Sequence, residues 1–223
     1  LTKSKQGGML KRLHLGRSAE SGILAARLAN EGYTGPETIL DGKFGFLETY
    51  SRGADAALFT AELHQDWETL RIAMKRYAMH GVAQTPVQAL RELMAEHGFK
   101  GDEVANVVVE GDAKLLSHHN NTEPNDVVQA QYSVPFCVAL ALFRDPDDPQ
   151  SLVAGGLDDA AIRAACRETV TLRARPEQSG QSFNTRVTVK LHDGRAFSRH
   201  ADTFKGRPSN PLSREDLRRK FML

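Results

Sequence analysis

The sequence has little of several features that would identify a function directly. It contains two cysteines, one tryptophan and 7% aromatic residues, and its 29 basic and 28 acidic side chains leave a formal net charge of +1. Such a balanced charge creates no overall field that would attract a nucleic acid or an anionic membrane, so we predict neither partner. Any site for an anion must therefore be local.

The two cysteines give no sign of a disulfide framework. Cys137 and Cys166 both lie in apolar helical patterns, which favours buried free thiols in a reducing compartment, and we predict a cytoplasmic protein. No apolar run is long enough to span a bilayer, and the first residues, LTKSKQGG, lack the pattern of a signal peptide.

Short motifs that would point to a cofactor are also missing. The sequence has no phosphate-binding glycine loop, no dinucleotide fingerprint, no serine-nucleophile elbow and no paired-cysteine zinc pattern. Adjacent His118 and His119 raise the question of a metal site. Successive residues of a helix point to different sides, so a polar loop or a helix end is favoured there. We predict no metal and no cofactor.

The pattern of the chain changes near Leu70, where we place a domain boundary. Residues 1–70 contain helix and loop signals, whereas residues 71–206 alternate strand and helix signals. The alternation predicts an α+β fold with an antiparallel sheet. Residues 207–223 turn helical again, with Ser213 as the helix cap, and we expect this tail to pack back on the first segment.

Local signals place several elements of the second part. The segment VANVVVEG, residues 104–111, is typical of a buried strand, and alternating apolar residues predict a hairpin around residues 192–194. A helix is expected with Thr85 as its cap and Pro86 in its first turn. A long apolar helix is interrupted at Pro135, which marks a helix start or a kink.

The stretch from Gly7 to Gly32 joins a cationic loop to an expected helix over residues 18–31, capped by Ser18 and closed by Gly32. Four side chains that are or can become cationic come just before that helix start: Lys11, Arg12, His14 and Arg17. Beside the positive end of a helix dipole they would repel one another unless an anion balanced them, so we predict a carboxylate site. The alternative is that they point into water or pair with acids elsewhere.

Five segments of the chain, taken in order, resemble the MmgE/PrpD family: MLKRLHLGRSAESGILAARLANEGYTGP, KFGFLETYS, IAMKRYAMH, QAQYSVPFCVALAL and FKGRPSNPLSREDL. That family includes 2-methylcitrate dehydratase, cis-aconitate decarboxylase and an iminodisuccinate epimerase. The resemblance implies a helical-domain fragment over residues 1–70, a smaller α+β lid domain over residues 71–206 and a return to the helical domain over residues 207–223. It also implies a piece of a longer protein, without its N-terminal helical part and its extreme C-terminus.

The resemblance also assigns catalytic residues by motif. The family's Lys-x-Leu-His-x-Gly pattern falls on Lys11, His14 and Gly16, and its Lys-x-Phe/Tyr-x-x-His pattern falls on Lys75 and His80. On this basis we predict that Lys11, Lys75 and His80 are catalytic.

Other side chains are predicted to bind the substrate: Arg12, His14, Arg17, Arg76 and Tyr132. An aromatic hydroxyl often occurs in the family at the place of Phe136, so this phenol is lost unless Tyr132 substitutes for it. Further site residues of the family lie upstream of Leu1.

These residue types suit proton transfer next to a carboxylate. Such a reaction needs a base or acid held close to the carbon, and cations that stabilise the enolate-like charge that develops on the carboxylate. We predict a cofactor-independent lyase that hydrates or dehydrates a small hydroxy-polycarboxylate resembling 2-methylcitrate. Epimerisation or isomerisation is the second candidate, and decarboxylation of a di- or tricarboxylate is the third because Phe136 lacks the hydroxyl.

A hypothesis of another class is that the chain is a non-catalytic binding or assembly fragment. It requires that Lys11, Lys75 and His80 do not converge on one cleft. Apolar helix faces left uncovered in such a piece would favour a homodimer or a missing companion segment.

Overall fold

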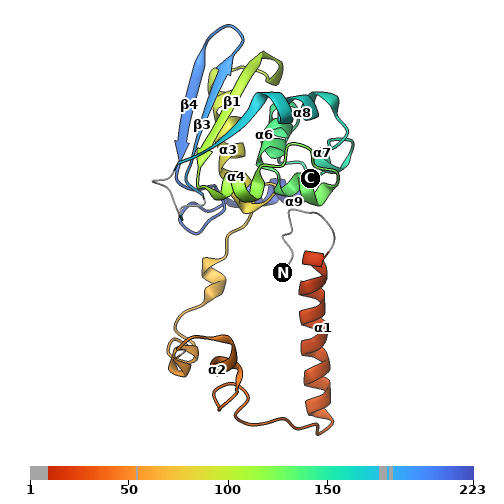
Figure 1. Cartoon of the computed structure of the whole chain (residues 1–223), viewed down its shortest axis with the longest axis vertical. Helices are drawn as coiled ribbons and strands as arrows, with labels where there is room; N and C mark the ends of the chain where they lie inside the picture. The colour runs from red at the N-terminus through yellow and green to blue at the C-terminus, as the bar shows by residue number, and fades with distance from the viewer. Residues whose placement is uncertain (1–9, 54, 176–179, 181–182) are drawn as a thin grey trace. The chain divides into compact units, whose positions relative to one another are not determined.

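The computed structural model describes residues 10–53, 55–175, 180 and 183–223. The chain divides into two compact units, an N-terminal unit, Met9–Arg71, and a C-terminal unit, Ile72–Leu223. Each unit is described by itself, and Figure 1 labels the elements of both.

The N-terminal unit begins with a long helix, α1 (Leu10–Asn30). Gly32 ends it in the left-handed conformation, at φ +86°, as the sequence predicts. The predicted start at Ser18 is wrong, because the helix already includes the eight residues before it. The leucines and basic residues of that stretch are good helix formers, and they extend the helix without a break.

The rest of the N-terminal unit contains short helical turns: α2 (Phe46–Tyr50), η2 (Ala56–Phe59) and η3 (Glu68–Arg71). Among its described residues only Gly45 is buried. Apolar side chains of α1 are largely exposed, for example Leu13 at 62% and Ile23 at 60%. A unit that buries so little apolar surface has no core of its own, so its stability must come from something outside it.

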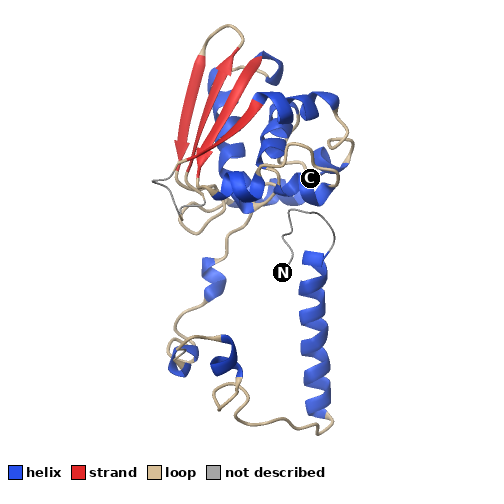
Figure 2. Ribbon diagram, viewed as in Figure 1, coloured by secondary structure: helices blue, strands red, loops and turns tan. Residues whose placement is uncertain are grey.

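The C-terminal unit is built on a four-stranded sheet in the order β2-β1-β3-β4 (Figure 2). The strands are β1 (Val104–Gly111), β2 (Val170–Ala174), β3 (Thr185–Leu191) and β4 (Ala196–Ala201). The α+β prediction is confirmed, and so is the hairpin, in which Gly194 takes a φ of +92° between β3 and β4.

The sheet is mixed, and the predicted antiparallel pairing joins β1 to β3 and β3 to β4. β1 pairs antiparallel with β3 and parallel with β2, with Val107 opposite Val170. A parallel pair needs a long crossover, and nearly sixty residues with several helices connect these two strands. Local sequence patterns therefore predict the strands but not the parallel pairing of β1 with β2.

Two helices, α3 (Gly81–His97) and α6 (Val134–Phe143), contact one face of the sheet (Figure 2). Along β3 the side chains alternate between buried and more exposed, so one face of the sheet supplies the core. In α6 every residue from Val134 to Leu142 is buried, which explains its uninterrupted apolar sequence. Both cysteines are buried free thiols, and burial raises the pKa of Cys166 to about 12.

Short helices complete the C-terminal unit: η4 (Gly101–Glu103), α4 (Lys114–His119), α5 (Val127–Tyr132), α7 (Gln150–Val153), α8 (Ala160–Ala164) and η5 (Ala165–Thr169). The long apolar segment is interrupted as predicted, because Ser133 ends α5 and caps α6 by accepting from the Phe136 N–H at 3.0 Å. Pro135 follows in the first turn of α6, where its missing N–H costs little.

The predicted cap of α3 is wrong. His80 is the N-cap, its Nδ1 accepts from the Val82 N–H at 3.4 Å, and Pro86 lies inside the helix. Thr85 is fully buried within α3, and its hydroxyl has no partner among the described residues. The histidine side chain provides the acceptor that we had expected from threonine, five residues earlier.

The chain's last helix, α9 (Arg214–Met222), begins at the predicted cap, Ser213. Ser213 and Asp216 form a capping box, and Lys205 Nζ lies 2.6 Å from an Asp216 carboxylate oxygen. These contacts, led by the Lys205 hydrogen bond, hold the pKa of Asp216 well below its ordinary value. Whether this segment belongs to a separate helical domain of the whole protein stays a prediction.

The lowered pKa predicts an acid-dependent loss of stability. Asp216 stabilises the fold fully above its unfolded pKa of about 4; this contribution declines below that pH and is lost as the pH falls through the lower pKa of the folded state. We expect Asp216→Asn to lower the free energy of unfolding by about 0.5–2 kcal/mol at neutral pH and by clearly less near pH 2. Chemical denaturation at several pH values measures this.

The matched control is Asp158→Asn, at an exposed position. It should leave the free energy of unfolding within about 0.5 kcal/mol of that of the parent chain. A difference between Asp216→Asn and the parent chain that stayed constant down to pH 2 would contradict the assignment to the carboxylate charge.

Within the described ranges, no helix combines the length and apolar character needed to cross a membrane.

Candidate active site

Three element ends meet in the C-terminal unit and bring three aromatic rings together. His80 precedes α3, His119 ends α4 and Tyr132 ends α5. The His80 ring centroid lies 4.5 Å from that of His119 and 4.6 Å from that of Tyr132. We call these residues the His80 cluster; the sequence predicted two of its three members as site residues.

Backbone hydrogen bonds hold the loop that carries His80. The buried Gln84 side chain accepts from the Tyr77 N–H at 3.0 Å and donates to the Tyr77 carbonyl at 3.0 Å. The His80 N–H donates to the Gln131 carbonyl at 2.8 Å, and Gln131 Nε2 donates to the Ala78 carbonyl at 2.9 Å. The position of His80 is therefore set by contacts with both α3 and α5.

The helix cap determines which nitrogen of His80 faces outward from α3. Nδ1 accepts from the Val82 N–H, so a neutral His80 carries its proton on Nε2. The positive end of the 17-residue helix α3 also disfavours an imidazolium there. A neutral imidazole with an Nε2 proton can donate a hydrogen bond or a proton to a developing negative charge.

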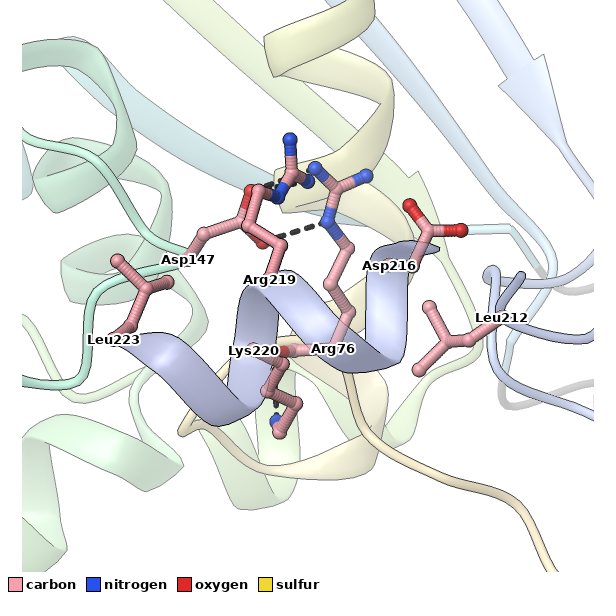
Figure 3. Close-up of a pocket in the computed structure, with 7 residues that line it drawn as sticks. All are labelled: Arg76, Asp147, Leu212, Asp216, Arg219, Lys220 and Leu223. Atoms are coloured by element: carbon pink, nitrogen blue, oxygen red, sulfur yellow. Dashed lines mark hydrogen bonds and ion pairs between the residues drawn. The ribbon is translucent and has the colours of Figure 1, made fainter. Parts of the chain in front are cut away.

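Arg76 lies in a different group of charges, drawn in Figure 3. Its guanidinium makes a bidentate pair with Asp147, with Nε–Oδ1 and Nη2–Oδ2 distances of 2.6 Å, and Arg219 Nη2 lies 3.1 Å from Oδ2. The Asp147 hydrogen bond raises the pKa of Arg76 above its already high ordinary value. Arg76 therefore docks α9, and its predicted role as a substrate ligand stays a prediction.

The pocket between Arg76, Asp147 and α9 is too small for a tricarboxylate. Its cavity volume is about 10 Å³, roughly the space of one water molecule. Figure 3 shows the side chains of Arg76 and Arg219 meeting at Asp147 above α9. The pocket lies at a junction where Arg76, Asp147 and Arg219 tie α9 to the rest of the unit.

Lys75 is exposed and lies five residues before His80. Its carbonyl accepts from Lys220 Nζ at 2.6 Å, so α9 contacts the backbone of the Lys75 segment as well as that of Arg76, at 2.8 Å. Burial lowers the pKa of Lys220. These contacts fix the main chain at Lys75 while its side chain remains at the surface.

The predicted cationic loop of the N-terminal unit is helical. His14 and Arg17 lie within α1 with exposed side chains, and Arg17 pairs with Glu20 at 2.6 Å. The side chains of Lys11 and Arg12 lie outside the described residues. The prediction that these residues form a loop before a helix start is therefore wrong, because they lie inside α1. The carboxylate site predicted for them stays a prediction.

Phe136 lies in the core, and as a phenylalanine it cannot supply the hydroxyl that the family often has at this position. It is fully buried within α6. Tyr132 is partly buried, and its ring lies beside His80. If a phenol takes part in the reaction from this region of the chain, Tyr132 is the residue placed for it.

Sequence reasoning missed His119 and Gln84 as parts of the site. A glutamine in the apolar run at the start of α3 and a histidine pair after a buried strand were the available signals. Gln84 acts through Tyr77 and Met79, seven and five residues away, whereas His119 contacts residues further along or back in the chain, Tyr132 and His80. Across the described ranges, no three potential metal ligands of the histidine, cysteine or carboxylate type come together.

Two family domains match the chain. The MmgE/PrpD C-terminal domain matches residues 77–223, and the MmgE/PrpD N-terminal domain matches residues 2–58. Similar proteins include the cis-aconitate decarboxylase of Homo sapiens, 29% identical over 224 residues, which cover 95% of this chain and 45% of that protein.

The mouse and fungal relatives have the same name. Cis-aconitate decarboxylase of Mus musculus is 27% identical over 222 residues, covering 95% of this chain and 44% of that protein. The protein of that name from Aspergillus terreus is 25% identical over 244 residues, covering 99% and 49%. The chain thus spans somewhat less than half the length of these relatives.

Proposed function

Since the chain belongs to the MmgE/PrpD family and is similar to cis-aconitate decarboxylases, we propose that the whole protein is a lyase acting on a small di- or tricarboxylate. The single observation that supports this most is the His80 cluster. It presents a helix-capping imidazole, at a position of the family's lysine–histidine motif, between two further rings.

The proposed reaction is proton transfer at a carbon next to a carboxylate. As charge moves onto the carboxylate, it becomes enolate-like and needs hydrogen-bond donors and cations nearby. His80 delivers or removes the proton through Nε2, and Lys75 and Lys11 supply positive charge. Arg12, His14, Arg17, Arg76 and Tyr132 are proposed contacts to the remaining carboxylates. None of these steps requires a cofactor or a metal.

Hydration or dehydration of a hydroxy-polycarboxylate such as 2-methylcitrate is our first candidate. In it, the proton at the acidic carbon and the hydroxyl on its neighbour leave together as water. Decarboxylation is the second candidate, and the names of the relatives favour it. In that reaction carbon dioxide leaves and a proton replaces it on the carbanion, so the same proton donor serves both.

The testing experiment incubates the whole protein separately with 2-methylcitrate, citrate, cis-aconitate and aspartate-derived dicarboxylates. Proton NMR follows loss of each compound, and a carbon dioxide assay runs in parallel. Appearance of an unsaturated or hydrated product without carbon dioxide supports dehydration or hydration. Release of carbon dioxide from cis-aconitate supports decarboxylation, and inversion without a mass change supports epimerisation.

A non-catalytic binding fragment remains the hypothesis of another class. It predicts no turnover with any compound on this panel. A shift in the thermal midpoint with one carboxylate and no turnover would support a binding module, because a ligand that binds only the folded state stabilises it.

Lys75→Ala in the whole protein is expected to lower kcat/KM for the substrate at least tenfold without unfolding the protein. The side chain is exposed, so its removal costs little stability, whereas the proposed cation for the substrate is lost. The control is Lys190→Ala, an exposed lysine of β3. Equal kcat/KM values for the two variants would remove Lys75 from the mechanism.

We also propose that the whole protein is a cytoplasmic homodimer. The apolar side chains of α1 are exposed in this chain, which favours a further surface that covers them in the whole protein. A second copy or the rest of the protein could supply that surface. Light scattering of the whole protein distinguishes the two, because only the dimer doubles the mass.

A further inference from the structure

We propose that His119 is a positioning residue for His80, one that holds the His80 ring in the orientation in which its Nδ1 accepts from the Val82 N–H. This inference rests on the proposed function for its kinetic consequence. Its structural part concerns two imidazole rings whose centroids lie 4.5 Å apart, inclined by 32°.

The burial of His119 sets it apart from the other described histidines. It is 8% exposed at the end of α4, whereas its neighbour His118 is exposed and contacts the Ser117 hydroxyl at 2.6 Å. Burying an imidazole is unfavourable unless its polar atoms find partners. The two adjacent histidines therefore occupy different environments, which gives the experiment an internal control.

The hydrogen bond of His119 determines its tautomer. Its Nδ1 lies 3.1 Å from the backbone carbonyl oxygen of Tyr132. A carbonyl oxygen can only accept, so Nδ1 must carry a proton, and in neutral His119 the lone pair is on Nε2. His80 has the opposite arrangement, since its Nδ1 accepts from the Val82 N–H.

Hydrogen bonds in the turn before α4 hold the helix that carries His119. The Asp112 carboxylate accepts from the Lys114 N–H and the Gly180 N–H, both at 2.7 Å, and these bonds lower the pKa of Asp112. Leu115 is buried in the same short helix. The start of α4 is thereby fixed against the core, and at its other end His119 is held by the contact with the Tyr132 carbonyl.

The ring contacts explain how His119 acts on His80. His80 packs against His119 and Tyr132, whose own centroids lie 6.3 Å apart, so the two neighbouring rings restrict rotation of the His80 side chain. Two imidazolium ions at this separation would repel each other, so a positive charge on both rings at once is unfavourable. A neutral, oriented Nε2–H is the form that donates to a developing carboxylate charge.

Two variants separate the hydrogen bond of His119 to the Tyr132 carbonyl from the packing of its ring against His80. His119→Phe keeps an aromatic ring beside His80 but cannot donate to the Tyr132 carbonyl. His119→Asn keeps a donor near the position of Nδ1 but loses the ring. We expect both variants to lower kcat of the whole protein at least tenfold while KM changes less than threefold, because the proton donor is misplaced but the substrate contacts remain.

The control is His118→Asn, which should keep kcat within twofold. Thermal midpoints of all variants are measured, and where His119→Phe does not fold the conclusion rests on His119→Asn. Values of kcat within twofold of the parent protein for the folded His119 variants, together with loss of activity in His80→Asn, would overturn the positioning role.

Long-range ¹H–¹⁵N NMR tests the tautomers without any substrate. We expect Nδ1–H for His119 and Nε2–H for His80 in the parent protein, and a tautomer mixture for His80 in His119→Phe. An Nε2–H tautomer at His119 would overturn the proposal. Failure of the proposed function would appear differently, as correct tautomers in a protein that turns over none of the carboxylates.

Discussion

His80→Asn is expected to lower kcat of the whole protein by about 10²–10⁴-fold, the usual contribution of a positioned general acid or base. Asparagine is a good helix N-cap, and its side-chain oxygen can accept from the Val82 N–H as Nδ1 of His80 does. The substitution therefore removes Nε2 and its proton while the cap of α3 stays satisfied. Steady-state kinetics with the substrate found by the panel, together with the thermal midpoint, measures both effects.

The matched control is His192→Asn, an exposed histidine in the turn between β3 and β4. It should leave both kcat and the thermal midpoint nearly unchanged. If His80→Asn retained kcat within twofold of the parent protein, His80 would act only as a helix cap, and the proposed proton transfer would need another donor.

Phe136→Ala is expected to lower the free energy of unfolding by about 3–5 kcal/mol, the usual cost of truncating a fully buried phenylalanine. Phe136 has no exposed surface, and α6 is buried around it from Val134 to Leu142. Two contributions add up: the favourable burial of the removed ring atoms is lost, and a cavity remains that the packed neighbours fill only in part. Urea denaturation followed by circular dichroism gives the value.

Phe136→Tyr tests the lost phenol more directly. A hydroxyl added in this core has to be buried, and without a hydrogen-bond partner it costs about 1–3 kcal/mol. Phe143→Ala at the end of the same helix, where the side chain is 39% exposed, is the control and should cost clearly less than Phe136→Ala. A Phe136→Tyr protein as stable as the parent would mean that the site accepts a phenol, and its activity would then show whether that hydroxyl assists the reaction.

Elements that depend on neighbours in sequence were predictable. The strand over residues 104–111 agrees with β1, and the cap at Ser213 and the turn at Gly194 follow from short-range backbone chemistry. The family, too, could be recognised, because several motifs occurred in the expected order. His80 and Tyr132 were selected as site residues from these motifs, and their catalytic roles remain predictions.

For other features the sequence pattern gives a wrong prediction or no signal. The start of α1 was placed at Ser18, although a serine is also tolerated inside a helix. The cap of α3 was assigned to Thr85, whereas tertiary contacts through Gln84 and Gln131 hold His80 in that place. The bidentate pair of Arg76 with Asp147 joins residues 71 positions apart.

The sequence by itself determined the family, the α+β class, the strand over residues 104–111, the hairpin and the cap at Ser213, because these follow from local backbone preferences and from motif order. Only the tertiary structure decided the parallel pairing of β1 with β2 and the meeting of His80, His119 and Tyr132. The physical reason is that these arrangements come from packing and hydrogen bonds between distant segments, and their free energy depends on the whole core rather than on any short stretch of residues.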